Sequence, residues 1–122
     1  MANIGANIGG MPLVRAITDD GTTWDDPAPA RIAALLGDVG REGGEGRFLI
    51  LERCADVSGH TYLQALRVEA GTYVVEFRDG SADRHYRAYS DAATVRAVLT
   101  AWASDAATWR DMLPWQHVEQ PS

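Results

Sequence analysis

The clearest pattern in this chain is an alternation of apolar and polar residues near its middle. Two segments, Tyr62–Glu69 and Thr72–Arg78, alternate with the period of two that is typical of half-buried strands. Ala70 and Gly71 between them fit a two-residue hairpin loop. If the two strands pair symmetrically about this loop, one face of the hairpin is apolar and the other is mixed. The predicted pairs on the apolar face are Val68 with Tyr73, Leu66 with Val75 and Gln64 with Phe77.

Shorter segments complete the predicted sheet. Leu13–Ile17 is an apolar run that ends at a turn over residues 19–21, and Phe48–Leu51 is short enough for a buried strand. Arg84–Tyr89 follows a turn at residues 79–82, and a tight loop there sets His85 opposite Glu76. The last predicted strand is Trp115–Glu119.

Two segments have helical periodicity. Pro29–Leu36 places Ile32, Leu35 and Leu36 on one face, with Asp25 or Asp26 as cap, Pro27 in the first turn, and Gly37 or Gly40 at the exit. A longer helix runs from Ser90 or Asp91 to about Ala103, with Val95, Val98, Leu99 and Trp102 inward. Ser104 or Asp105 can cap a further turn that Pro114 ends. The fold class is therefore α+β, with an antiparallel β-meander of about four to five strands packed against one long and one or two short helices.

The domain organisation follows from length and from the first residues. Residues 1–10 hold the tandem units 2–5 and 6–9 and have no strand or helix period, so we expect a flexible tail. The rest of the 122-residue chain, 11–122, is long enough for a single α+β domain with an ordinary hydrophobic core.

The net charge of the chain disfavours some classes of binding partner. All eleven cations are Arg, against seventeen carboxylates, which gives a net charge of −6. This sign disfavours nucleic acid, and the absence of a long apolar run disfavours a membrane span. One cysteine, Cys54, allows no internal disulfide, so we expect a cytoplasmic protein. Half of the net charge lies in residues 1–30, which hold Arg15 against four Asp.

Few residues suggest catalysis. Cys54 is interpreted as a packed thiol, and His85 is expected to pair with Glu76 across the sheet rather than to act as a base. His117 has no partner that the sequence identifies, and no ligand spacing predicts a metal or other cofactor. We therefore expect no catalytic residue, no cofactor and no metal.

The candidate binding residues are aromatic and acidic. Trp24, Trp109 and Trp115 fall in turns or short elements, where a tryptophan either fills the end of a core or anchors an interface. Asp25 and Asp26 flank Trp24 within an acidic cluster that also holds Asp19 and Asp20. These carboxylates serve either as turn and cap residues or as part of a surface for a basic protein partner.

The order of elements carries a resemblance to a known family. At Arg47-Phe-Leu-Ile-Leu-Glu52, Thr61-Tyr-Leu-Gln64 and Tyr73-Val-Val-Glu-Phe77, in the helix with Val95 and Leu99, and at the closing Leu113-Pro-Trp115, the chain resembles small actinobacterial α+β immunity proteins of polymorphic toxin systems. The resemblance spans residues 27–118 and implies a protein that binds and blocks a toxin domain.

Three functional hypotheses remain open. The leading one is a non-enzymatic protein-binding module, an immunity- or antitoxin-type inhibitor of a basic toxin domain. The second is a small enzyme or small-molecule binder with a pocket near His85, Glu76 and Tyr86. The third is a homodimeric structural or chaperone-like module joined through a free strand edge.

Overall fold

A computed structural model describes residues 12–41 and 46–119 of the chain. The expected flexible tail, residues 1–10, lies outside the described residues. The elements in chain order are β1 (Val14–Thr18), β2 (Thr23–Asp25), α1 (Pro29–Val39), β3 (Phe48–Arg53), β4 (Thr61–Glu69), β5 (Thr72–Asp79), β6 (His85–Ser90), α2 (Ala92–Ala103), the 3-10 helix η2 (Ala107–Asp111) and β7 (Gln116–His117).

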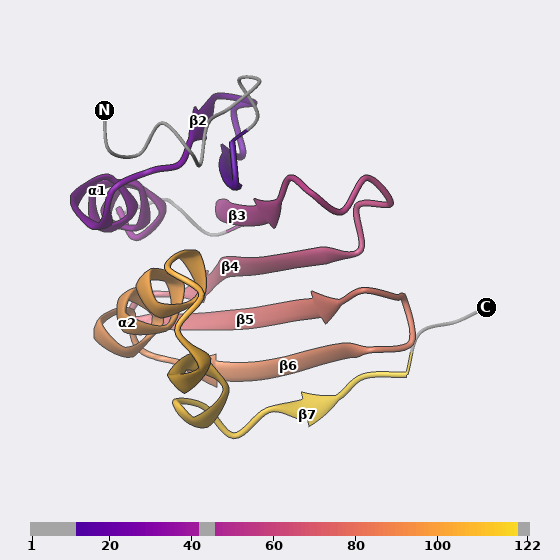
Figure 1. Cartoon of the computed structure of the whole chain (residues 1–122). Helices are drawn as coiled ribbons and strands as arrows, with labels where there is room; N and C mark the ends of the chain where they lie inside the picture. The colour runs from indigo at the N-terminus through magenta and orange to yellow at the C-terminus, as the bar shows by residue number, and fades with distance from the viewer. Residues whose placement is uncertain (1–11, 42–45, 120–122) are drawn as a thin grey trace.

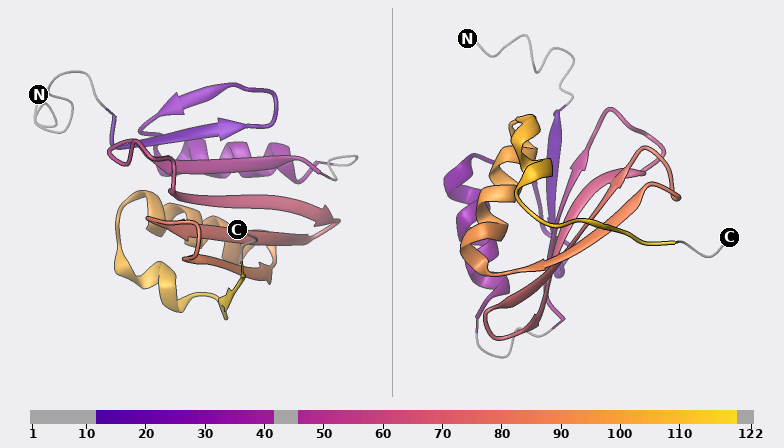
Figure 2. Two further views of the ribbon diagram at one scale, coloured as in Figure 1. Left: turned by 90° about the vertical axis from the view of Figure 1, so that its right-hand side faces the viewer. Right: turned by 90° about the horizontal axis from the view of Figure 1, so that it is seen from below.

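The architecture is α+β, as predicted, with two layers. All seven strands form one antiparallel sheet in the order β2-β1-β3-β4-β5-β6-β7. Both α-helices and η2 cover the same face of this sheet, and the opposite face carries no helix of the described chain (Figure 1, Figure 2). The described residues form seven strands, more than the expected four to five. Strand β7 lies within the predicted strand Trp115–Glu119, whereas the short edge strand β2 was not predicted.

The predicted β4–β5 register is wrong by one residue over most of its length. Glu69 pairs with Thr72 as expected, but the register shifts between Arg67 and Glu69, so that Arg67 pairs with Tyr73. A one-residue shift turns every β4 side chain to the other face. The core-facing residues of β4 are therefore Leu63, Ala65 and Arg67, in place of the predicted Gln64, Leu66 and Val68.

The β5–β6 register differs from the prediction by two residues. Arg78 lies opposite His85 and Glu76 opposite Arg87, because the connection is longer than the tight loop that we expected. A shift of two keeps each side chain on its predicted face. Consequently the predicted contact between His85 and Glu76 still forms, now along a diagonal.

The N-cap predicted from the sequence is correct for α2 but not for α1 or η2. Asp91 caps α2 as predicted, since its side chain accepts the Thr94 N–H. For α1 the predicted cap is wrong, because Ala28 holds the N-cap position and Pro29, not Pro27, lies in the first turn. The helix then continues through Gly37 and ends before Gly40. Likewise Ala106, rather than Ser104 or Asp105, precedes η2.

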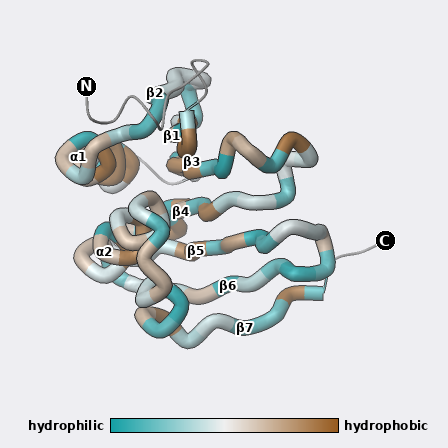
Figure 3. The backbone as a smooth tube through the Cα atoms, in the orientation of Figure 1, coloured by the Kyte–Doolittle hydropathy of each residue, from teal (hydrophilic) through white to brown (hydrophobic). Residues whose placement is uncertain are grey.

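The core lies between the helices and the sheet. Ile32 and Leu36 of α1 and Val95, Leu99 and Trp102 of α2 are buried, in agreement with the helical periodicity. They pack against inward residues of the central strands, and Figure 3 shows the hydropathy along each element. The helices of the described ranges are too short or too polar to cross a membrane.

Candidate functional site

The five predicted partner-binding residues divide into two groups at opposite edges of the sheet. Trp24 and Asp25 belong to β2, with Asp26 directly after it, whereas Trp109 lies in η2 and Trp115 precedes β7. Strands β2 and β7 are the two ends of the strand order. The predicted residues therefore do not form one surface.

Trp109 and Trp115 close one end of the core. Their ring centroids lie 5.9 Å apart, and both pack edge-on against buried Phe77, at 4.7 and 4.8 Å. Tyr86 also stacks on Phe77, with ring centroids 4.8 Å apart. Such edge-to-face and stacked contacts are typical of aromatic core packing. Of the two roles left open for these tryptophans, core filling is the one that these contacts favour.

Trp24 has both a core contact and a surface groove. It is half-buried, packs against the core from β2, and carries the Arg31 guanidinium 5.7 Å from its ring centroid. Between β2 and α1 lies a shallow groove of about 480 Å³ that we call the tryptophan groove. Its lining is mainly apolar and includes Trp24, Pro27, Ala30 and Ala34, with Arg31 at the side.

The two aspartates after Trp24 serve the local fold in different ways. Asp26 adopts a left-handed conformation, with φ of 45°, and its Oδ1 accepts the N–H groups of Leu13 at 2.9 Å and Val14 at 3.0 Å. It thus joins the start of β1 to the end of β2. Asp25 forms an ion pair with Arg15 at 2.9 Å, and its side chain remains 56% exposed. Exposed pairs of this kind contribute little to stability, so Asp25 stays available to a partner.

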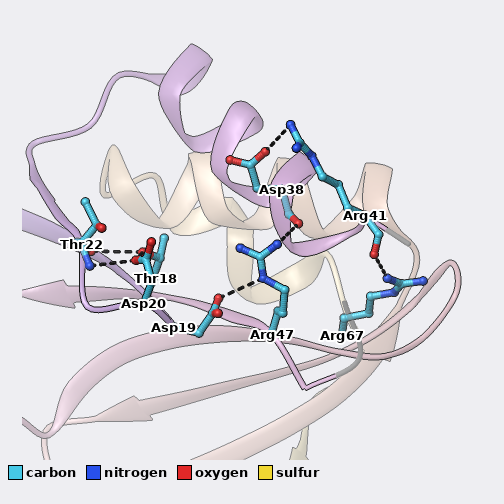
Figure 4. A network of polar contacts seen from close by, with 8 residues as sticks. All are labelled: Thr18, Asp19, Asp20, Thr22, Asp38, Arg41, Arg47 and Arg67. Atoms are coloured by element: carbon cyan, nitrogen blue, oxygen red, sulfur yellow. Dashed lines mark hydrogen bonds and ion pairs between the residues drawn. The ribbon is translucent and has the colours of Figure 1, made fainter. Parts of the chain in front are cut away.

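The acidic cluster that the sequence suggested is separated by the β1–β2 hairpin. Asp19 and Asp20 lie at its turn, and Asp25 and Asp26 at its opposite end. Figure 4 shows the turn end, where Asp20 accepts the Thr18 hydroxyl at 2.6 Å and Asp19 faces Arg47 at 3.4 Å.

The turn-end carboxylates are therefore already engaged. The two hydrogen bonds from Thr18 and Thr22 lower the pKa of Asp20 to about 2. Arg47 also donates to the Asp38 carbonyl oxygen at 2.9 Å, and the buried Arg67 donates to that of Arg41. These contacts tie the end of α1 to the sheet, which assigns this network a structural role.

At the Asp25 end, three strands and a loop bring together charges from distant parts of the chain. Arg15 lies opposite Asp25 on one side and opposite Glu52 of β3 on the other. With Asp56 and Val57 from the β3–β4 connection they line a hollow of about 440 Å³, which we call the acidic groove. It holds three carboxylates around Arg15. Arg53 also lines it, and its guanidinium donates to the Trp102 carbonyl oxygen.

Val57 gives the acidic groove an apolar rim. The residue is 97% exposed and lies in the connection between β3 and β4. Asp56 holds this connection in place by accepting the hydroxyls of Ser58 and Thr61, each at 2.5 Å.

Cys54 also lines the acidic groove but is a poor nucleophile there. Burial raises the pKa of its thiol, and Glu52, Asp25 and Asp26 raise it further, against the opposing effect of Arg15. A raised pKa keeps the thiol protonated at neutral pH. Among the described residues, no group of three or more His, Cys, Asp or Glu side chains is arranged to hold a metal ion.

His85 lies on the helix-free face of the sheet with both ring nitrogens engaged. Arg78 Nε donates to Nδ1 at 3.2 Å, which leaves the proton on Nε2, and Nε2 contacts Glu76 Oε1 at 2.5 Å. Only 4% of its side chain is exposed. Tyr86, expected in the same pocket, faces the core and stacks on Phe77. This geometry fits a structural histidine better than a general base, which needs a free nitrogen within reach of substrate.

Sequence reasoning identified Asp25 but missed Arg15, Glu52, Asp56 and Val57 as its neighbours. These residues converge only through the pairing of β1 with β3, which are separated in the chain by β2 and α1. A signal existed in the opposite charges of Arg15, in the middle of one predicted strand, and Glu52, directly after another, because opposite charges are favourable as cross-strand pairs.

Comparisons with protein-family models, curated proteins and solved structures found no match to this chain.

Proposed function

We propose that this protein is a non-enzymatic protein-binding module that docks a basic partner at its acidic groove. The observation that carries the proposal is the convergence of Asp25, Glu52 and Asp56 around Arg15, beside the exposed Val57. Negative potential of this kind attracts a basic surface and speeds its association, while an apolar rim supplies contact area.

The finer proposal is that the partner is a basic toxin domain and that this protein is its immunity- or antitoxin-type inhibitor. Supporting it are the overall charge of −6, the engaged nitrogens of His85 and the protonated thiol of Cys54, which leave binding as the simpler role. In this role the protein covers the partner's active surface and matches its positive charge, without any chemical step.

The test is co-expression with the product of the adjacent gene, followed by light scattering for the complex and stopped-flow measurement of association. The Asp25→Asn/Glu52→Gln double variant reduces the charge of the groove and leaves the loop-holding Asp56 intact. The matched control is Glu69→Gln/Asp111→Asn, which makes the same charge change at exposed positions outside the groove.

The groove variant should associate about tenfold more slowly at low ionic strength, with the difference shrinking as salt is added. The control should keep nearly the native rate. Failure to form a complex, or equal slowing by both double variants, would contradict the proposal.

A further inference from the structure

Strand β2 is a sheet edge whose outward backbone groups can be assigned. Within the described chain it pairs only with β1. The hairpin bonds are Thr18 N–H to the Thr22 carbonyl oxygen at 3.0 Å and Asp26 N–H to the Val14 carbonyl oxygen at 2.7 Å. Directly opposed residues of an antiparallel pair alternate between bonded and non-bonded, so Trp24 bonds with β1. Thr23 and Asp25 therefore direct their backbone N–H and C=O groups away from the sheet.

The two grooves lie on opposite sides of this edge. Trp24 points to the helix face, where the tryptophan groove lies between β2 and α1. Asp25 points to the other face, as does Arg15, and both line the acidic groove. Asp25 lines both grooves, so both grooves border β2.

This placement specifies the chemistry of a strand that adds to the edge. Successive side chains of an added strand point to opposite faces. Those on the helix face meet Trp24, Pro27 and the alanines of α1, and Arg31 at the side of that groove disfavours another cation there. Those on the other face meet the exposed carboxylate of Asp25, which favours arginine or lysine.

We propose that β2 receives an extended strand from the partner protein, and that this strand alternates apolar with basic residues. The inference rests on the proposed function and specifies how the basic partner docks. Backbone bonds to Thr23 and Asp25 supply the register, and the two grooves supply the selectivity, as in other cases of strand addition. The edge is only three residues long, so an isolated peptide should bind weakly and a folded partner that presents the strand more tightly.

The test uses the full chain, labelled for heteronuclear NMR, and a short capped peptide in which valine and arginine alternate. Three control peptides separate the contributions: one with the same composition in two blocks, one with glutamate for arginine, and one N-methylated at every second amide. The alternating peptide should shift the amide signals of Thr23 and Asp25, and each control should bind about tenfold more weakly or not at all. Equal binding of the block peptide would reveal attraction by charge alone and overturn the proposal.

A matched pair of variants tests the edge itself. Thr23→Pro removes an outward N–H at a position where an edge strand tolerates proline, and Thr23→Val keeps that N–H. The proline variant should bind the alternating peptide about tenfold more weakly and the valine variant within about twofold of the native protein. Native affinity in a folded Thr23→Pro variant overturns the proposal. If the proline variant does not fold, the N-methylated peptide provides the same test on the native chain.

Failure of this inference is distinguishable from failure of the proposed function. A complex with the adjacent gene product that weakens with Asp25→Asn/Glu52→Gln but not with Thr23→Pro supports the proposed function and overturns strand addition. Binding of the alternating peptide at β2 without any complex of the adjacent gene product supports strand addition and contradicts the proposed toxin partner.

Discussion

Asp26 combines two separable contributions to stability, which makes it a sharp test of the structure. Its φ of 45° favours glycine, asparagine or aspartate over other residues, and its carboxylate accepts two backbone N–H groups at the start of β1. Substitution by Asn, Gly and Ala removes these contributions in different combinations. Asn keeps the conformational tolerance and one acceptor oxygen, Gly keeps only the tolerance, and Ala keeps neither.

The expected magnitudes follow from these combinations. Loss of the two hydrogen bonds in Asp26→Gly should lower the free energy of unfolding by about 1–2 kcal/mol, since both bonds lie near the surface. Asp26→Ala adds the strain of a left-handed alanine and should lower it by about 1 kcal/mol more. Asp26→Asn should stay within about 1 kcal/mol of the native protein.

Urea unfolding at neutral pH, followed by tryptophan fluorescence, measures these differences, provided that the denaturant slope is the same in all variants. The predicted stability order is Asp, Asn, Gly, Ala. If the Asp26→Ala variant is as stable as Asp26→Gly, the left-handed conformation is not required at this position. If all three variants are as stable as the native protein, Asp26 does not join β1 to β2.

Three further predictions concern the core and the pH dependence. A Cβ at Gly40 would overlap the Tyr73 hydroxyl, so Gly40→Ala should destabilise the protein by about 1–3 kcal/mol. Adding Tyr73→Phe should recover part of this loss in a double-mutant cycle of urea melts, and strict additivity would refute the contact. Phe77→Leu removes the ring that Tyr86 and the two tryptophans contact, so it should lower the free energy of unfolding by about 2 kcal/mol and reduce the near-UV circular dichroism. An unchanged spectrum would contradict this packing. The pKa of Asp20, lowered to about 2 from 3.8, means that its stabilising effect is complete above roughly pH 4 and is lost as the pH falls toward 2. Asp20→Asn should therefore flatten the fall in melting temperature over that range, whereas a parallel curve would refute the assigned hydrogen bonds.

The elements that could be predicted from the sequence are those in which apolar residues recur at a regular spacing over many positions. Helix α2 has both a capping residue and four inward residues at helical spacing, and both features hold in the structure. Strands β4 and β5 were identified by their alternation. Their register was not, because it depends on a bulge at Val68 that the hairpin loop does not determine. Bulges of this kind change which face each residue occupies without altering the local pattern.

Short elements and long-range pairs account for the other differences. Strand β2 has three residues, too few for a period, and Asp25 and Asp26 beside it also suited a helix cap. The acidic groove combines β1, β2, β3 and the β3–β4 connection, so its membership follows from sheet topology rather than from any segment. The acidic cluster seen in the sequence was split for the same reason, since a hairpin separates residues that are close in the chain.

The strand order also bears on how the sheet forms and opens. Strands β3 to β6 are consecutive hairpins that can assemble from local contacts, whereas the β1–β2 hairpin joins them only across α1, and β7 only across α2 and η2. The two edges should accordingly open more readily than β4 and β5, and their amide protons should exchange with solvent sooner. A partner strand bound at β2 would then do more than cover a surface, because it would also slow the exchange of the Thr23 and Asp25 amides and hold that edge closed.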